Sequence, residues 1–195
     1  MKKLLMSLSV LVGLLITGCA TSSPSVGVTE STALKEVSGV KNGVKYFKLA
    51  EQYNKKRDSV NTLKYLHKAC DLNYGKGCYF LGTFYEIGEG TRKDYVKASR
   101  YYKKGCDLNN DVACYRLGNL YYQGQGVKKN QLKASKYYKK GCDMNVPASC
   151  TFLGTIYMEG GDGVKKDHNK AMKYLKKACS LHDVGGCVMK TLIEK

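Results

Sequence analysis

Eight of the nine cysteines in this 195-residue chain fall into four pairs with a single spacing. Seven residues separate the members of each pair: Cys70 and Cys78, Cys106 and Cys114, Cys142 and Cys150, and Cys179 and Cys187. Paired thiols at a fixed spacing have two common uses in proteins, a disulfide bond or the coordination of a metal ion. The compartment decides between these uses, because disulfides persist mainly under oxidising conditions.

The first residues of the chain indicate export. Lys2 and Lys3 form a charged head, residues 4–16 are apolar, and small residues lead to Cys19. This order is typical of a secretory signal peptide, and the apolar run is too short for a lasting membrane span, which needs about twenty residues. The motif ITGC at residues 16–19 resembles the bacterial lipobox, in which the cysteine is acylated and becomes the mature N-terminus.

The lipobox resemblance implies that residues 1–18 are a lipoprotein signal peptide and that the Cys19 thiol carries the membrane anchor. The residue after the cysteine is Ala20 rather than an aspartate, which favours the outer membrane. Residues 19–40 are rich in Ser, Thr, Val and Gly and show no helical stripe of apolar residues, so we expect a flexible tether. The expected location is therefore the periplasm or the cell surface.

Once Cys19 is assigned to the anchor, an even number of cysteines remains in an oxidising compartment, which favours disulfides within the equally spaced pairs. A metal site has little support. No CxxC motif occurs, and the three histidines, His67, His168 and His182, lie far apart in the sequence. We therefore predict four structural disulfides, no metal and no other cofactor.

The cysteine pairs belong to a longer repeat. Cys70, Cys106 and Cys142 are 36 residues apart, and Cys179 follows after 37. Other residues recur in the same register: Leu81-Gly82, Leu117-Gly118 and Leu153-Gly154; Tyr85, Tyr121 and Tyr157; and Ala98, Ala134 and Ala171. A regular period of this length indicates an array of small structural units.

Each unit contains two helical patterns of about a dozen residues. The first pattern ends at a glycine that we expect to close the helix in the left-handed conformation: Gly88, Gly124 or Gly160. The second pattern carries lysines on its polar side, which we interpret as a solvated face, and it starts at a good N-cap residue: Asp94, Asn130 or Asp167. Two such short helices must stack on their neighbours to bury their apolar faces.

The segment LGTFYEIGEGTRKDYVKASRYYKKGCDL, residues 81–108, resembles the SEL-one-like repeat, a relative of the tetratricopeptide repeat. The cysteine pair in every unit makes it similar to the Helicobacter cysteine-rich proteins. The resemblance covers about residues 41–195 and implies an all-α solenoid of about four helical pairs, coiled as a right-handed superhelix, with a capping helix near 184–194. The first unit departs from the pattern, with a shortened turn and with Thr62 where alanine recurs.

In this architecture Cys142 ends the second helix of one unit and Cys150 lies in the first helix of the next. Asn145 and Pro147 then form the turn between the two helices. Antiparallel helices joined by a short turn bring such positions within the roughly 4.4–6.8 Å between Cα atoms that a disulfide requires. The solenoid is thus expected to carry one disulfide per repeat.

Tetratricopeptide geometry, carried over by resemblance, places the first helices on a concave surface. Nine residues would face this groove: Tyr79, Thr83, Glu86, Tyr115, Asn119, Tyr122, Thr151, Thr155 and Met158. We expect a monomeric interaction scaffold that binds a protein, a peptide, or a cell-wall or β-lactam-like ligand there. Packing of these tyrosines against neighbouring helices is the alternative at each position.

An enzymatic function is the alternative that the resemblance raises, since the cysteine-rich proteins are described as penicillin-binding proteins or β-lactamases. The motif S-x-x-K occurs once, from Ser38 to Lys41, and neither S-D-N nor K-T-G accompanies it, so no catalytic residue can be assigned. The formal charge of +17 would attract phosphate, but export makes nucleic acid an unsuitable partner. Anionic lipid or an acidic envelope partner fits this charge better.

Overall fold

The structure, a computed structural model, describes residues 30–194, with side chains from residue 38 onward. This part of the chain folds into nine α-helices without a regular β-strand. The helices are α1 (Glu30–Lys55), α2 (Ser59–Asp71), α3 (Gly75–Ile87), α4 (Tyr95–Asp107), α5 (Asp111–Gln123), α6 (Gln131–Asp143), α7 (Pro147–Glu159), α8 (His168–Ser180) and α9 (Val184–Ile193).

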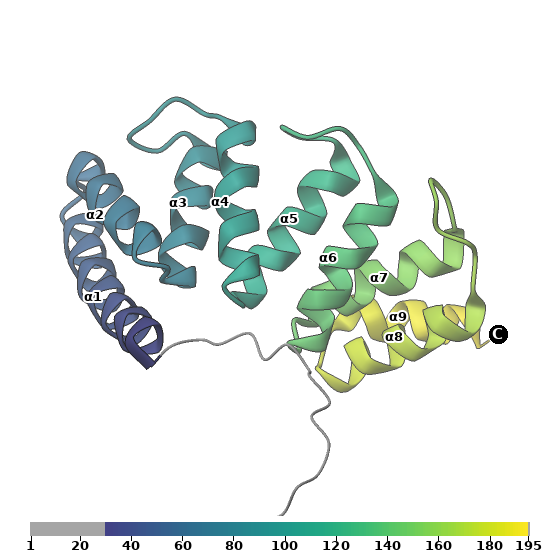
Figure 1. Cartoon of the computed structure of the whole chain (residues 1–195). Helices are drawn as coiled ribbons and strands as arrows, with labels where there is room; N and C mark the ends of the chain where they lie inside the picture. Colours follow the sequence, from purple (N-terminus) through teal and green to yellow (C-terminus); the bar gives the residue numbers. More distant parts are fainter. Residues whose placement is uncertain (1–29, 195) are drawn as a thin grey trace, which may run out of the picture.

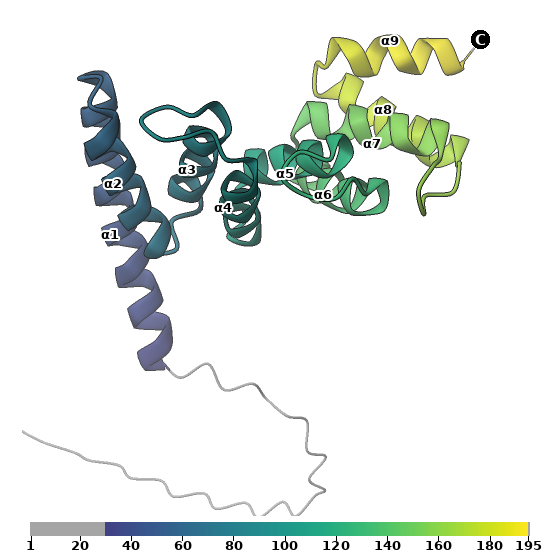
Figure 2. The same ribbon diagram turned by 90° about the horizontal axis from the view of Figure 1, so that it is seen from above.

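The helices pack as successive pairs, α1 with α2, α3 with α4, α5 with α6, and α7 with α8, and α9 packs against α7 and α8 (Figure 1). Each pair also contacts the next pair along the chain. In the view from above the array curves from α1 and α2 toward α9, and α3 and α5 lie on the inner side of the curve relative to α4 and α6 (Figure 2). The predicted all-α solenoid with a final single helix is confirmed.

The second helices of units 2 to 4 begin at the predicted N-cap residues. The side chains of Asp94, Asn130 and Asp167 accept hydrogen bonds from the backbone N–H groups three residues later, at 2.9, 2.7 and 2.9 Å. Each bond satisfies one of the amide donors that have no partner within the first turn of a helix. Polar residues at these positions therefore determine where the second helices start.

The first helices end at the predicted glycines, with one difference. Gly88 and Gly124 have φ angles of 82° and 77° and adopt the left-handed conformation. Gly160 has a positive φ of 72° but an extended ψ of −167°. The unit that starts at α7 contains one extra residue, and the chain accommodates it in a small turn in which Gly161 and Val164 form a β-bridge. Val164 is buried beneath that turn.

Helix α1 extends further toward the N-terminus than predicted. It begins at Glu30, so the part of the proposed tether from residue 30 to residue 40 is helical. The sequence lacks an apolar stripe there, but a helix that is already nucleated gains one hydrogen bond for each residue it adds. The packed part of α1 against α2 supplies that nucleus. The proposed signal peptide, Cys19 and residues up to 29 lie outside the described residues.

The core of the solenoid consists of alanine, leucine, cysteine and tyrosine side chains that recur in register. Two tyrosines of the second helices, Tyr102 and Tyr138, are fully buried. A Cβ atom on Gly82 would lie 2.6 Å from the ring of Tyr102, and one on Gly118 would lie 2.7 Å from the ring of Tyr138. The glycine of each Leu-Gly pair therefore lets the second helix of its unit approach closely.

Candidate functional site

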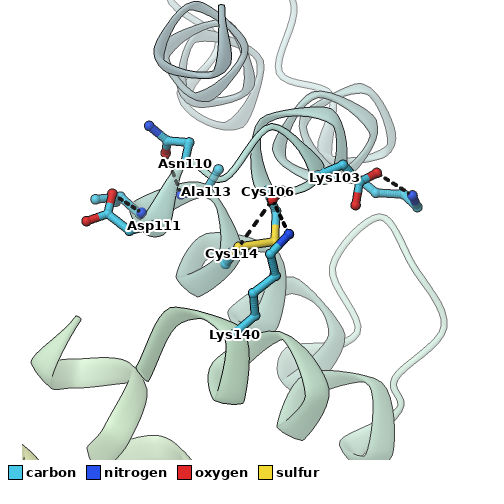
Figure 3. Close-up of a disulfide and its surroundings, with 9 residues drawn as sticks. Lys103, Cys106, Asn110, Asp111, Ala113, Cys114 and Lys140 are labelled. Carbon is cyan, nitrogen blue, oxygen red and sulfur yellow. Dashed lines mark hydrogen bonds and ion pairs between the residues drawn. A yellow bond between two sulfur atoms is a disulfide. The ribbon is translucent and has the colours of Figure 1, made fainter. Parts of the chain in front are cut away.

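The four predicted disulfides are present. Each joins the last turn of a second helix to the first turn of the next first helix, with Cα–Cα distances between 4.5 and 4.7 Å. Figure 3 shows the bridge between Cys106 and Cys114 and its surroundings. The first three bridges are fully buried, whereas Cys179 and Cys187 are half-buried at the end of the array. The cysteines therefore hold the units together.

Small residues allow the helices to approach closely beside each bridge. The residues that immediately precede the two bridged cysteines face each other, and one member of every such pair is glycine: Ala69 and Gly77, Gly105 and Ala113, Gly141 and Ser149, and Ala178 and Gly186. A Cβ atom added at Gly77 would lie only 2.7 Å from the Cβ of Ala69. A larger side chain in this pair would force the two helices apart and strain the bridge.

The lysines of the second helices have two different roles. Lys103 and Lys139 are exposed and form ion pairs with Asp107 and Asp143, each at 2.7 Å. The next lysine in units 2 to 4 is half-buried, and in units 3 and 4 it reaches back to the preceding unit. Lys140 donates a hydrogen bond of 2.6 Å to the carbonyl of Cys106 (Figure 3), and Lys177 donates one of the same length to the carbonyl of Cys142.

These contacts correct the interpretation of the lysines as one solvated face. The carbonyl groups in the last turn of a helix lack partners within that helix, and a cation near them is favourable. Lys140 and Lys177 supply both a donor and a charge to the preceding unit. Their role is structural, so in units 3 and 4 only the first lysine of the pair belongs to the solvated surface.

The nine residues predicted to line the groove all lie on α3, α5 and α7 and are all half-buried. They do not form a single constellation, because the three residues of each helix meet a different set of neighbours. A tyrosine of the following helix, or a residue from the next unit, packs against each group. We call the surface formed by these nine residues the groove surface.

The group on α3 is polar. The hydroxyl of Tyr102 donates a hydrogen bond to the carboxylate of Glu86 and lies 3.2 Å from the hydroxyl of Thr83. Burial and the bond to Glu86 raise the pKa of Tyr102 well above its usual value. The ring of Tyr79 stacks on that of Tyr102 at 6.1 Å.

Arg116 from the next unit joins the α3 group. Burial disfavours its charge, but the nearby Glu86 carboxylate and the surrounding tyrosines raise the pKa of its guanidinium above the ordinary value. The Nε atom of Arg116 is buried and has no hydrogen-bond partner among the described residues. This part of the groove surface therefore contains a hydrogen-bonded phenol, with the Arg116 guanidinium under the electrostatic influence of the Glu86 carboxylate.

The group on α5 is aromatic. The hydroxyl of Tyr138 donates a 2.7 Å hydrogen bond to the side-chain oxygen of Asn119. Phe152 of the next unit stacks on Tyr138 at 5.3 Å and contacts Tyr115 and Tyr122 at 6.0 and 6.3 Å between ring centroids. Phe152 occupies the repeat position that Arg116 has one unit earlier. An aromatic ring therefore stands here in place of a charged guanidinium.

The group on α7 is the least aromatic of the three. The hydroxyl of Thr151 donates a hydrogen bond to the carboxylate of Asp183, which also caps α9. Thr155 bonds to the carbonyl of Thr151 within the same helix at 3.1 Å. Met158 is half-buried at the position that Glu86 and Tyr122 have in the earlier units. This group supports the capping helix as well as the groove surface.

Four residues that pack against the groove surface were absent from the prediction: Tyr102, Arg116, Tyr138 and Phe152. Their register contained a usable signal. Arg116 and Phe152 lie 36 residues apart, one position after Tyr115 and Thr151, and Tyr102 and Tyr138 precede the repeated lysine pairs. Arg116 and Phe152 contact residues of the preceding unit. Such contacts between units cannot be predicted when each repeat unit is considered alone.

A second row of aromatic residues repeats without variation. Each unit after the first stacks a tyrosine of the first helix on one of the second helix, and a lysine lies over the first ring at 5.1, 5.3 or 5.4 Å. The stacked pairs are Tyr85 with Tyr101, Tyr121 with Tyr137, and Tyr157 with Tyr174. Because the same three residues recur in units 2 to 4, this row fits a structural role within the repeat.

The described residues contain no cluster of three or more His, Cys, Asp or Glu side chains that is suited to hold a metal ion. Within residues 30–194, none of the helices combines the length and the apolar character needed to cross a membrane. Ser38 and Lys41, the S-x-x-K pair, lie one turn apart on α1 and are both exposed. Neither of them lies on the groove surface.

Proteins of Helicobacter pylori match short parts of the chain. A stretch of 48 residues is 42% identical to HcpD of Helicobacter pylori (strain J99) and covers 25% of this chain and 16% of that protein. Beta-lactamase HcpA of the same strain is 49% identical over 39 residues, which cover 20% of this chain and 16% of that protein. The chain thus matches less than a fifth of the length of these two relatives.

Solved structures match the fold over most of the chain. A Sel1 repeat protein from Oxalobacter formigenes superposes with a TM-score of 0.65 and 26% identity, over 84% of this chain and 65% of that one. A protective antigen of uropathogenic Escherichia coli, which displays an SLR fold, gives a TM-score of 0.64 and 26% identity. That match covers 81% of this chain and 33% of the antigen.

The Sel1 repeat matches four consecutive segments, residues 43–74, 75–110, 111–146 and 147–183. These segments coincide with the units seen in the structure, except that each match ends in the turn that the disulfide spans. The matched segments make up most of the chain. The protein therefore belongs to the Sel1 repeat family.

Proposed function

We propose that this protein is an exported, lipid-anchored interaction scaffold that binds a peptide or another envelope ligand on its groove surface. Sel1 repeats form scaffolds of the kind that mediate contacts between proteins, and repeat solenoids offer extended binding surfaces. The four disulfides support a position in an oxidising compartment. Nothing in this proposal requires a catalytic group.

One observation carries the proposal. The core positions keep apolar or small residues from unit to unit, and several are identical, as Leu81, Leu117 and Leu153 show. The groove surface varies at structurally equivalent positions: Tyr79, Tyr115 and Thr151; Thr83, Asn119 and Thr155; and Glu86, Tyr122 and Met158. Varied chemistry on an invariant frame is typical of a surface that recognises something outside the repeat.

The excess of positive charge supports an acidic partner. The chain carries 33 basic and 16 acidic residues, and Lys97, Lys133 and Lys170 are exposed beside the aromatic row. Charge of this kind accelerates the encounter with an acidic protein, an acidic polymer or anionic lipid head groups. We propose that it brings the partner to the scaffold and that the groove surface provides the specificity.

The groove surface is tested by replacing Tyr115 and Asn119 with alanine. We expect this variant to lose most of a partner that crosslinks to the wild type in living cells, because an aromatic contact and an amide are removed together. Helicity should be retained, since both residues are half-buried and Asn119 contributes one hydrogen bond, worth about 1 kcal/mol. Crosslinking followed by mass spectrometry measures the loss, and circular dichroism measures the helicity.

The matched control for this test is Lys103→Glu with Lys139→Glu. Both lysines are exposed and lie outside the groove surface, and neither reaches back to another unit as Lys140 does. A partner lost equally from both double variants would contradict the groove surface and support the basic surface instead. Lys140 is unsuitable as a control because its replacement would also weaken the solenoid.

The lipid anchor is tested by Cys19→Ala. The acylated thiol would be the only membrane attachment, so the variant should move from the detergent-requiring membrane fraction to the soluble fraction or stay unprocessed. Fractionation with an antibody against the solenoid, with metabolic fatty-acid labelling alongside, measures the change. Detergent-dependent fractionation that is the same for variant and wild type would rule out the anchor.

Hydrolysis of β-lactams is the second candidate, and the name of HcpA is the observation that favours it. Turnover of a chromogenic cephalosporin by purified mature protein would support this candidate if alanine at Tyr115 and Asn119 abolished it. The absence of turnover, together with a captured partner, would leave the scaffold as the function.

A further inference from the structure

The first unit of the solenoid contains a cavity that the later units fill. Its volume is about 290 Å³, and it opens between α1, α2 and α3. The walls are formed by Phe47, Ala50, Leu66 and Phe80, and the polar residues Glu51 and Asn54 line it as well. Phe47, Ala50 and Leu66 are buried, whereas Glu51 and Asn54 are exposed.

The cavity residues stand at the same repeat positions as the groups of the groove surface. Leu66 precedes Tyr102 by 36 residues, and Phe80 precedes Arg116 by 36 residues. Because the turn of the first unit is shorter, the α1 residues are offset by 32 residues from those of α3, the offset that relates Tyr53 to Tyr85. Phe47, Glu51 and Asn54 then correspond to Tyr79, Thr83 and Glu86.

Contacts in the structure support this alignment. The rings of Phe47 and Phe80 lie 5.3 Å apart, as the equivalent rings of Tyr115 and Phe152 lie 6.0 Å apart two units later. Ala50 and Leu66 line the same cavity, and the alignment gives Ala50 the position that Gly82 has opposite Tyr102. Units 1, 2 and 3 therefore contain an equivalent space between their helices, formed by different residues in each unit. We call this space the chamber.

A tyrosine of the second helix fills the chamber in units 2 and 3. The ring of Tyr102 lies against Tyr79, and its hydroxyl bonds to Glu86 and Thr83. In the next unit the hydroxyl of Tyr138 bonds to Asn119, the counterpart of Thr83. In the first unit Leu66 has neither the ring nor the hydroxyl, so the outer part of the chamber is left as the cavity.

We propose that this cavity binds the side chain of a tyrosine residue presented by a polypeptide partner. The ring lies between Phe47, Leu66 and Phe80, and its hydroxyl donates a hydrogen bond to Glu51 or Asn54, as the chain's own tyrosines do in the next two units. The proposal that the tyrosine belongs to a polypeptide partner depends on the proposed function. The proposal that the cavity binds a phenol depends only on the residues that line the cavity.

The size and the polarity of the cavity both favour a single phenol. Its volume of about 290 Å³ lies just below the roughly 300–1,000 Å³ typical of small-molecule sites, which suits one side chain. Glu51 and Asn54 offer a carboxylate and an amide oxygen as acceptors, at the positions where Thr83 and Glu86 accept the phenol of Tyr102. A phenylalanine side chain would leave these acceptors unused.

The fourth unit shows why leucine alone does not make such a site. Leu175 occupies the position of Tyr102 and Leu66, but the residue opposite is Gly154, whose hydrogen allows Leu175 to approach closely. The acceptor positions hold Thr155 and Met158, which provide neither a carboxylate nor an amide. The combination of leucine, Ala50 and two strong acceptors occurs in the first unit.

The test uses p-cresol, the side chain of tyrosine, and toluene, the side chain of phenylalanine. Both probes are titrated into purified mature protein labelled with ¹³C at leucine methyl groups, and the signal of Leu66 is followed by NMR. We expect both to shift this signal and p-cresol to bind about tenfold more tightly, the effect of one net hydrogen bond. Equal affinity for the two probes, or no shift with either, would overturn the proposal.

Two sets of variants locate the site. Ala50→Gly with Leu66→Tyr reproduces the residues of units 2 and 3 and should fill the cavity, so that p-cresol binding is lost while the fold is kept. Glu51→Ala with Asn54→Ala should abolish the preference for p-cresol over toluene and leave toluene binding unchanged. Undiminished p-cresol binding by the filled variant would place the site elsewhere and contradict the assignment.

The reverse exchange in the third unit provides a gain of binding. Gly118→Ala with Tyr138→Leu gives that unit the alanine and leucine of the first unit and should create a second p-cresol site near Asn119. These tests need no partner, so they separate the cavity from the proposed function. If p-cresol binds as expected but the filled variant still captures the crosslinked partner, the cavity stands and its use for that partner is wrong.

Discussion

Replacing Cys142 and Cys150 together by alanine is expected to lower the free energy of unfolding by about 2.5 kcal/mol, the chain-entropy value for a loop of this size. The bridge is fully buried and joins α6 to α7, an interface inside the array. The stability of a solenoid is close to a sum of terms between neighbouring units. Loss of this bridge should therefore let the last units separate from the others before the whole chain unfolds.

Two measurements check this expectation. Chemical denaturation gives the loss of free energy, and limited trypsin digestion should cut the variant first near Lys139 and Lys140, in the last turns of α6. The matched control is the same replacement at Cys179 and Cys187, a half-buried bridge that holds only the terminal helix. An equal effect of both replacements would contradict nearest-neighbour stacking, because the internal interface should matter more than the cap.

Gly118→Ala is expected to cost about 1–2 kcal/mol although alanine is the better helix former. The added Cβ atom would lie 2.7 Å from two atoms of the Tyr138 ring, which is fully buried and cannot move aside. The first unit of this chain shows the compatible combination, Ala50 opposite Leu66. Combining Gly118→Ala with Tyr138→Leu should therefore cost less than the sum of the two single changes, by about 1 kcal/mol or more.

Denaturation of the wild type, both single variants and the double variant gives this coupling energy directly. Gly185→Ala on α9 is the matched control, because the nearest atom to the added Cβ would lie 3.5 Å away. That change should be neutral or slightly stabilising. If the single and double effects at 118 and 138 simply add, the close contact between the glycine and the ring has no energetic consequence, and the steric argument for the Leu-Gly pairs is wrong.

Much of the architecture was predictable from residues that are close in the sequence. The pairing of the cysteines, the N-caps at Asp94, Asn130 and Asp167, and the left-handed glycines after α3 and α5 all depend on interactions within one or two turns of chain. The repeat register then extended each local inference from one unit to its neighbours. The identical spacing restricted the possible disulfide pairings, since only cysteines of adjacent helices can come close enough to form a bond.

Tertiary structure alone decided the features that link one unit to the next. The hydrogen bond from Lys140 to the carbonyl of Cys106 spans 34 residues. Because of this bond, a lysine that was predicted to lie on a solvated face has a structural role. The start of α1 at Glu30 depends on the packed turns that follow it. The extended ψ of Gly160 depends on how the longer turn folds over Val164.

The same limit applies to the groove surface. The sequence by itself placed the nine residues at equivalent positions of α3, α5 and α7 through the repeat register, and the groove that they would line is what the resemblance to tetratricopeptide geometry implies. Whether a position is filled or open depends on a side chain from another helix: Tyr102 and Tyr138 close the chambers of units 2 and 3, and Leu66 leaves that of unit 1 open. Volume is a property of packed neighbours, so only the tertiary structure revealed the cavity.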